Sequence, residues 1–314
     1  MAEETTDLLI NESELVEETS DALADESEMS EEFYDFLSDR PVAEYWDGRP
    51  TYLQEWYSMV ANFSTGHSRA WDVGTGNGIA AHGIAEFYDE VIATDISEVE
   101  LEKARPHPKV TYMHTPPSMS DEELISKLGG EASLDMITVA QAIQYFDLPR
   151  FYSMVNRVLK PDGVIIVWGY INEKSEFFFN GESGPKFLPQ DLLWERLLES
   201  ALPYRGPNVR DISDEYKTLP FPFEDVGIGG EGDPFNLIIP TRLTFEGFLE
   251  MARAWPDVAA AKDQGVDVLS EELIEEFRAD WGDRPVDLIP RPFLFKGFML
   301  AGSLKKESMD VNGS

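Results

Sequence analysis

The residues best suited to chemistry lie in the stretch Arg69–Asp95, where a glycine-rich run separates two short apolar segments. Gly74, Gly76 and Gly78 have no side chains, so the backbone there can turn sharply and bring its N–H groups close to a ligand. Asp95 ends the second apolar segment, where a carboxylate can accept both hydrogen bonds of a ribose diol. This spacing predicts a pocket for a ligand that contains adenosine.

The glycine spacing alone leaves three kinds of ligand open. A dinucleotide-binding loop needs a third glycine where the chain has Ile79, and a phosphate-binding P-loop needs a Gly-Lys-Ser/Thr sequence that does not follow. What remains is an acid-x-Gly-x-Gly-x-Gly run that begins at Asp72. A carboxylate beside the loop repels phosphates and attracts a cation. The run therefore favours S-adenosylmethionine, which carries an ammonium and a sulfonium group.

Asp72–Gly78, followed by Thr94 and Asp95, resembles motifs I and II of the class I S-adenosylmethionine-dependent methyltransferases. The resemblance extends over about residues 33–304 and is strongest to plant methyltransferases described as embryo-abundant-like. It implies an enzyme that uses S-adenosylmethionine. The segments that carry it are Ala70–Gly78, Ile137–Ala142, Trp168–Tyr170, Thr218–Glu224 and Ala261–Gly265.

A second resemblance lies ahead of the glycine run. Tyr45, Arg49 and Tyr52 follow the pattern Tyr-x-x-x-Arg-Pro-x-Tyr, which is similar to a segment of the trans-aconitate methyltransferase group. It implies that these side chains contact the cofactor or a substrate carboxylate, which the arginine fork can bind through two hydrogen bonds. The alternative is that both tyrosines belong to the core and that Arg49 faces solvent.

The resemblance implies a cofactor site built from the loop and from the ends of the strands around it. Its members are Tyr45, Arg49, Asp72, Gly74, Thr75, Gly76, Asn77, Gly78, Asp95, Ile96, Thr115, Ala140 and Gln141. Thr115 or the backbone must take the adenine contact, because the chain has His114-Thr115 where a polar partner is expected. No metal site is expected, because the four histidines lack metal-ligand spacing.

No residue stands out as a catalytic base. The residues expected to position the methyl acceptor are Arg49, Gln144, Tyr145, Trp168 and Tyr170. The family has a histidine where this chain has Gln144-Tyr145, so a role that needs histidine is lost, although the glutamine amide can still bind a carboxylate. For Trp168 and Tyr170 the alternative is ordinary core packing at the end of a strand.

The elements around the loop alternate between strand-like and helix-like segments, which indicates an α/β fold with a doubly wound sheet. We expect a seven-stranded, mostly parallel, Rossmann-like sheet with helices on both faces. A turn at Lys160–Gly163 should lead into the fifth strand, and residues 171–243 should form a substrate-cover insertion after it. The expected helices are 79–88, 97–104, one that begins at Ser120, 151–159, 192–202, 244–255 and 270–281, and the expected strands are 69–73, 91–95, 110–113, 133–140, 164–170, 235–239 and 293–300.

Composition sets the domain limits and excludes some partners. The formal net charge is −35, and the first 35 residues contain fourteen acidic and no basic residues. We expect residues 1–32 to be a disordered acidic arm, 33–304 the methyltransferase domain and 305–314 a flexible tail. Such a negative surface repels nucleic acids and anionic membranes.

The absence of cysteine, of a membrane-spanning run and of a signal-peptide pattern favours a cytoplasmic protein. The oligomeric state stays open.

The expected reaction is transfer of a methyl group to a small molecule, with O-methylation of a carboxylic acid as the first hypothesis. A carboxylate is already ionised at neutral pH and needs no base, which agrees with the lack of one. Two alternatives stay open: C-methylation of a quinone-like ring, and a non-catalytic protein that binds S-adenosylmethionine and holds a partner.

Overall fold

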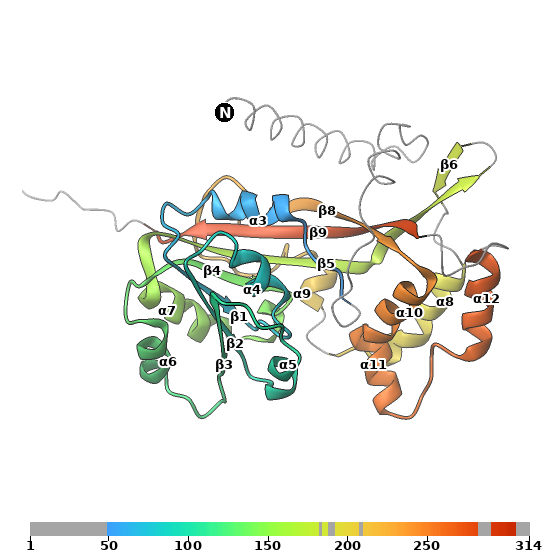
Figure 1. Cartoon of the computed structure of the whole chain (residues 1–314), viewed down its shortest axis with the longest axis horizontal. Helices are drawn as coiled ribbons and strands as arrows, with labels where there is room; N and C mark the ends of the chain where they lie inside the picture. The colour runs from blue at the N-terminus through green and yellow to red at the C-terminus, as the bar shows by residue number, and fades with distance from the viewer. Residues whose placement is uncertain (1–48, 182–183, 188–191, 207–209, 282–289, 306–314) are drawn as a thin grey trace, which may run out of the picture. The chain divides into compact units, whose positions relative to one another are not determined.

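The computed structural model describes residues 49–181, 184–187, 192–206, 210–281 and 290–305 (Figure 1). The chain divides into two compact units. We call the first the loop unit, because it contains the glycine run; it comprises Tyr52–Tyr170, Asn208–Phe235 and Phe298–Ser314. The second, which we call the helical unit, comprises Met1–Thr51, Ile171–Pro207 and Asn236–Gly297. The predicted acidic arm lies outside the described residues.

The loop unit contains the alternating elements that the sequence predicts. Its helices are α3 (Gln54–Ala61), α4 (Ile79–Ile84), α5 (Glu98–Glu102), α6 (Asp121–Leu128), the 3-10 turn η1 (Ile143–Tyr145), α7 (Leu148–Val158) and α9 (Arg210–Ser213). Its strands are β1 (Arg69–Val73), β2 (Glu90–Asp95), β3 (Val110–His114), β4 (Leu134–Ala140), β7 (Glu224–Asp225) and parts of β5 (Leu159–Gly181) and β9 (Arg291–Ser303).

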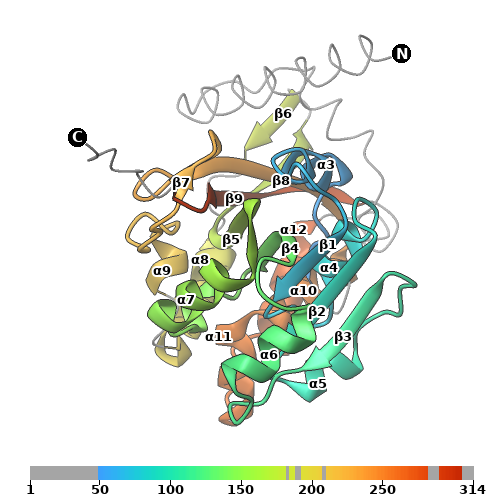
Figure 2. The ribbon, with the colours of Figure 1, turned by 90° about the vertical axis from the view of Figure 1, so that its left-hand side faces the viewer.

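The central strands are parallel, as the α/β prediction requires. Strand β1 pairs in parallel with β2 and β4, β2 pairs with β3, and β4 pairs with β5. Strand β4 is buried along nearly its whole length, which fits its apolar run between two layers of helices. Figure 2 shows α6 and α7 on one side of β1 and β4, with α3 and α4 on the other.

The predicted number of seven strands is wrong. The sheet has nine strands, in the order β3-β2-β1-β4-β5-β9-β7, with β6 (Gly184–Phe187) paired to β5 and β8 (Phe235–Leu243) paired to β9. The short strands β6 and β7 carry too few residues for an apolar pattern to reveal them.

Several predicted boundaries are also wrong, most of all the end of β5, which continues to Gly181 instead of residue 170. The expected turn at Lys160–Gly163 is absorbed into β5, where Leu134 faces Leu159 and Met136 faces Val164, so the extra residues form an irregularity in the pairing. The helix expected over 79–88 ends at Ile84, because the chain then continues with three-residue turns such as Phe87 N to Ile84 O.

Local capping explains where two of the helices begin. The Ser97 hydroxyl accepts a hydrogen bond from Glu100 N at 3.3 Å, and the Ser120 hydroxyl accepts one from Glu123 N at 3.2 Å. Each serine thereby satisfies a backbone donor that has no partner inside its helix. Both predicted caps are confirmed.

Helix α3 packs on α4 through one glycine. A side chain at Gly83 would overlap the Tyr57 ring, so only glycine leaves room for the ring against α4. The Tyr57 hydroxyl donates to Ile79 O at 3.1 Å, which fixes α3 to the first turn of α4. Burial raises the pKa of the Tyr57 phenol well above its ordinary value, so it stays a donor.

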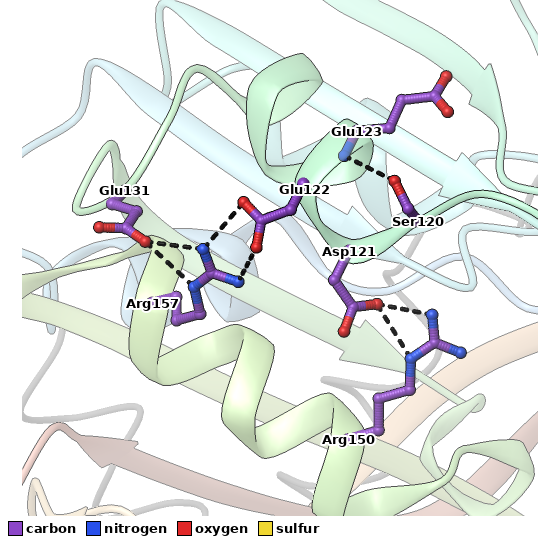
Figure 3. A network of polar contacts seen from close by, with 7 residues as sticks. All are labelled: Ser120, Asp121, Glu122, Glu123, Glu131, Arg150 and Arg157. Carbon is purple, nitrogen blue, oxygen red and sulfur yellow. Dashed lines mark hydrogen bonds and ion pairs between the residues drawn. The ribbon is translucent and has the colours of Figure 1, made fainter.

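Helices α6 and α7 are joined at the surface by ion pairs (Figure 3). The Arg150 guanidinium donates twice to one oxygen of Asp121, at 3.0 and 2.6 Å. Arg157 lies between Glu122 and Glu131 and donates to both. These side chains are exposed, so we expect the pairs to align the helices and to add little stability.

The helical unit is held together by aromatic packing. The Trp194 ring centroid lies 4.4 Å from that of Trp255 and 5.7 Å from that of Phe248. The predicted helices at 192–202, 244–255 and 270–281 are confirmed, whereas α11 was not predicted because it follows α10 without a break in the pattern. The elements are α8 (Leu192–Ala201), η2 (Leu202–Tyr204), β8 (Phe235–Leu243), α10 (Phe245–Ala254), α11 (Pro256–Asp263) and α12 (Glu271–Trp281).

In the described part of the chain, none of the helices has the length and apolar character needed to cross a membrane.

Candidate cofactor site

The glycine run forms a tight turn between β1 and α4. Gly74, Gly76 and Gly78 have φ angles of 68°, 56° and 86°, all in the left-handed region that side chains disfavour. A Cβ atom at Gly74 would lie 2.6 Å from Ala142 Cβ, and one at Gly78 would lie 2.5 Å from the Tyr112 hydroxyl oxygen. The glycines are therefore required both by the turn and by the close approach of neighbouring strand ends.

Asp72 is fully buried at the end of β1 and fastens the turn to its neighbours. One carboxylate oxygen accepts from the Thr75 hydroxyl at 2.6 Å, and the other accepts from the Thr138 hydroxyl on β4 at 2.7 Å. Burial raises its pKa to about 6, although these hydrogen bonds act in the opposite direction. The chain thus places a negative charge behind the turn and holds it with two hydroxyl groups.

Asp95 ends β2 and holds the other side of the turn. One carboxylate oxygen accepts from Gly76 N at 2.7 Å, and the other accepts from Ser97 N at 2.8 Å. Each oxygen has a further lone pair, so the group can still accept the two hydrogen bonds of a ribose diol. Thr75 N donates to Thr94 O at 2.9 Å, which brings the turn and the end of β2 together.

The segments after β2 and β3 surround Asp95. Ile96 is 63 % exposed, and Thr115 N donates to Asp95 O at 2.8 Å. His114 contacts the Ile96 carbonyl oxygen through Nε2 at 3.0 Å and Glu98 through Nδ1 at 3.0 Å. Ile96 thereby offers an apolar surface directly after Asp95.

The end of β4 lies against the glycine turn. Ala140 pairs with Trp168 of β5, and Gln141 has a left-handed φ of 59°, rare for a residue with a side chain. Gln141 Nε2 donates to Tyr170 O at 2.8 Å, and Gln144 Nε2 donates to Gln141 O at 2.9 Å. These bonds connect the ends of β4 and β5.

An aromatic cluster lies at the end of β5. The Tyr52 ring is T-shaped to those of Trp56, Trp168 and Tyr170, at centroid distances of 5.3, 5.5 and 6.4 Å. Trp168 is only 2 % exposed, yet its Nε1 has no hydrogen-bond partner among the residues that the structure describes. Tyr145 is 58 % exposed and has no place in this cluster.

The structure brings together most, not all, of the residues that the sequence selects. Asp72, Asp95, the glycine turn and the ends of β4 and β5 lie in the loop unit. Arg49 belongs to the helical unit and Tyr45 lies outside the described residues. The binding role of every residue in this set stays a prediction. Sequence reasoning missed Thr138 and Tyr216, whose hydroxyls bind Asp72 and Gln144.

Comparison with known proteins agrees with this geometry. Residues 71–167 match a family of methyltransferase domains. The chain is 28 % identical over 244 residues to a protein of Dictyostelium discoideum that carries a methyltransferase name, covering 76 % of this chain and 85 % of that one. It is 29 % identical to the Saccharomyces cerevisiae protein CRG1, whose name describes an S-adenosylmethionine-dependent methyltransferase, over 41 % of this chain and 45 % of that one.

One solved structure is similar along nearly its whole length. It is a type II methyltransferase by name, from Anaeromyxobacter dehalogenans, with a TM-score of 0.65 and 28 % identity. The match covers 82 % of this chain and 99 % of that one.

Proposed function

We propose that this class I S-adenosylmethionine-dependent methyltransferase transfers the methyl group to an oxygen of a small carboxylic acid. The observation that carries the proposal is the pairing of two donors without a partner in the described part of the chain, the second N–H of the half-buried Gln144 amide and the indole N–H of Trp168. A buried donor costs free energy unless something accepts from it. A carboxylate held at the end of β5 would do so.

The residues of the loop unit suit S-adenosylmethionine. Asp95 has lone pairs for the ribose diol, Ile96 offers an apolar surface to the adenine, and the charge of Asp72 favours the cationic methionine part. The cofactor supplies an activated methyl group on a sulfonium. The chain's own task is to align the acceptor with that methyl group and to keep water away.

The polar groups near the strand ends favour an acceptor that needs no base. Asp72 is enclosed, and both of its oxygens already accept from hydroxyls, so it is badly placed to remove a proton from an acceptor. Gln144 offers an amide and Trp168 an indole N–H, both of which stabilise a carboxylate by donation. These local donors act at contact distance, whereas the distant negative charge of the chain is screened by salt.

Several finer expectations belong to this proposal. We propose that the chain resembles the plant embryo-abundant-like and trans-aconitate subgroups in its acceptor, that residues 171–243 cover the substrate and that Arg49 assists in binding a carboxylate. A cytoplasmic location is proposed on the absence of cysteine from the sequence.

Cofactor binding is tested by calorimetric titration with S-adenosylmethionine. Asp95→Ala removes both diol contacts and the acceptor for two backbone amides, so we expect affinity to fall about a hundredfold. Glu102→Ala, which removes an exposed acid on α5, serves as the matched control. Equal affinity of the two variants would contradict the assignment of the pocket.

The acceptor is tested with methyl-labelled cofactor and a panel of acids: trans-aconitate, benzoate and cinnamate. A methyl ester loses its label as methanol in base, whereas a methyl group on carbon keeps it. Base-stable product would favour C-methylation of a ring. A purified full-length chain that binds cofactor but labels neither the acids nor a metabolite extract would favour the non-catalytic alternative.

A further inference from the structure

A tyrosine far away in the sequence reaches the two segments that carry the acceptor candidates. The Tyr216 hydroxyl donates to Gln144 Oε1 at 3.0 Å, across 72 positions of sequence. A Cβ atom at Gly169 would lie 2.8 Å from the Phe298 ring and 3.2 Å from the same hydroxyl oxygen, so both rings pack closely against the glycine between Trp168 and Tyr170. Tyr216 therefore lies where the ends of β4 and β5 meet.

The backbone around Tyr216 is held in an unfavourable conformation. Glu215 and Tyr216 have φ angles of 59° and 58°, so two successive residues with side chains adopt the left-handed region. The Tyr216 side chain is completely buried, and its ring packs edge-on against Phe298 at a centroid distance of 4.8 Å. Strain of this kind persists only where the surroundings enforce it, and it is common next to functional sites.

The hydrogen bonds fix which way the Gln144 amide points. The Gln141 carbonyl can only accept, so the Gln144 nitrogen must face it, at 2.9 Å. The Gln144 oxygen then faces Tyr216, which donates to it. One of the two amide hydrogens of Gln144 is used by Gln141, and the second has no partner among the described residues.

Gln144 lies close to the cofactor turn. It belongs to η1, which begins directly after Ala142. The methyl group of Ala142 limits the space at Gly74. The Phe146 ring, two residues later, would lie 3.3 Å from a Cβ atom at the same glycine. Gln144 is half-buried, so part of it remains exposed at this end of the sheet.

We propose that Tyr216 is a positioning residue that holds the Gln144 amide so that its second N–H donates to the oxygen-bearing group of the methyl acceptor. This inference rests on the proposed function, because it assigns the donor for that acceptor. Tyr216 acts through Gln144 and does not itself contact the reacting atoms.

The main test is a double-mutant cycle on methyl transfer to whichever panel acid reacts fastest. Tyr216→Phe removes only the hydroxyl, and we expect kcat/KM for the acid to fall about tenfold while the affinity for S-adenosylmethionine is unchanged. In a Gln144→Ala background the same change should have no further effect. An equal loss in both backgrounds would overturn the proposal.

Tyr152→Phe is the matched control. Tyr152 is also a buried tyrosine, and its hydroxyl donates to a backbone carbonyl of the same segment, Pro220 O, at 2.5 Å. It does not contact Gln144. We expect both tyrosine variants to lose similar thermal stability and only Tyr216→Phe to lose kcat/KM; matching losses of kcat/KM would show a structural effect and overturn the proposal.

A second measurement needs no acceptor. The chain has five glutamines, Gln54, Gln141, Gln144, Gln190 and Gln264, so a ¹⁵N-glutamine-labelled full-length protein gives few side-chain signals. The Gln144 signal is identified by its loss in Gln144→Ala. We expect Tyr216→Phe to shift it and Tyr152→Phe to leave it unchanged. An unmoved signal would overturn the proposal, whereas a shifted signal with no acid methylated would support the positioning role and contradict the proposed acceptor.

Discussion

The two units differ in how many polar side chains they bury. The described residues that are both buried and polar or charged are Ser64, Asp72, Thr75, Asn77, Thr94, Asp135, Thr138, Glu215 and Thr241, and only Thr241 belongs to the helical unit. Both units bury aromatic rings, but the described interior of the helical unit is otherwise almost wholly apolar around rings such as Trp194 and Phe248. Apolar packing is non-directional, whereas hydrogen bonds fix angles. The loop unit therefore has the kind of interior that holds a binding site in one geometry.

Asp135 shows how the loop unit uses a buried charge for structure rather than for binding. One oxygen accepts from Ser68 N and Arg69 N at 3.1 and 3.0 Å, and the other accepts from Lys160 at 2.6 Å. These bonds join the starts of β1, β4 and β5. Asp72 joins β1 to β4 near their other ends, beside the glycine turn, by accepting hydrogen bonds from the Thr75 and Thr138 hydroxyls.

The largest effect is expected in the helical unit. Trp194 is 1 % exposed, so Trp194→Ala leaves a cavity among Trp255, Phe248 and Phe293 and should lower the free energy of unfolding by about 3–5 kcal/mol. Denaturant unfolding measures this change, and Leu202→Ala, at a 48 % exposed site, is the control. The affinity for S-adenosylmethionine should not change; a large change would contradict the separation of roles between the units.

The next effect concerns the charge behind the glycine turn. Burial raises the pKa of Asp72 from 3.8 to about 6, so the folded protein binds this proton more tightly than the unfolded chain does. The stabilising contribution of Asp72 is complete below 3.8, the pKa of its carboxyl group in the unfolded chain. The contribution is lost as the pH rises from there through about 6, the pKa in the folded protein. The loss is on the order of 3 kcal/mol.

Asp72→Asn removes this titration. Unfolding free energies of both proteins, measured from about pH 4 to about pH 7, should show the difference between wild type and variant falling as the pH rises. Parallel curves would mean that Asp72 titrates at its ordinary pKa in the folded protein.

A smaller effect separates two buried threonines. Thr138→Val removes a hydrogen bond to Asp72 and should cost about 1–2 kcal/mol of unfolding free energy. Thr241→Val in the helical unit is its matched partner, because the buried Thr241 hydroxyl has no hydrogen-bond partner in the described part of the chain. We expect that change to be neutral or stabilising. Equal costs in thermal unfolding would remove the distinction between a polar and an apolar interior.

The smallest effect is expected at the surface of the loop unit. Arg157→Ala breaks ion pairs to Glu122 and Glu131, all exposed (Figure 3). Solvent and salt screen such pairs. The melting temperature should change little in low salt and not at all in high salt. A shift as large as that of Thr138→Val would show that this network contributes real stability.

The sequence predicts the parts of the fold that depend on neighbouring residues. The parallel strands, the serine caps and the glycine turn follow from local patterns, and the structure confirms them. Thr138 and Tyr216 could not be found in this way. Each hydroxyl acts on a residue more than sixty positions away, and nothing in the local sequence indicates that partner.

The errors in element boundaries also have a physical origin. Lys160–Gly163 has the composition of a turn, yet pairing with β4 draws these residues into β5 with an irregularity. Helix α11 begins with Pro256 immediately after Trp255, so one apolar pattern runs over two helices. Proline at a first helical position starts a new helix as readily as it ends an old one.

The packing of α3 on α4 has an evolutionary consequence. The Tyr57 ring occupies the volume that any side chain at position 83 would need, and its hydroxyl binds the first turn of α4. The combined volume of the side chains at positions 57 and 83 is therefore limited. In related chains, a residue larger than glycine at position 83 should occur together with a smaller residue at position 57, and each change alone should be selected against.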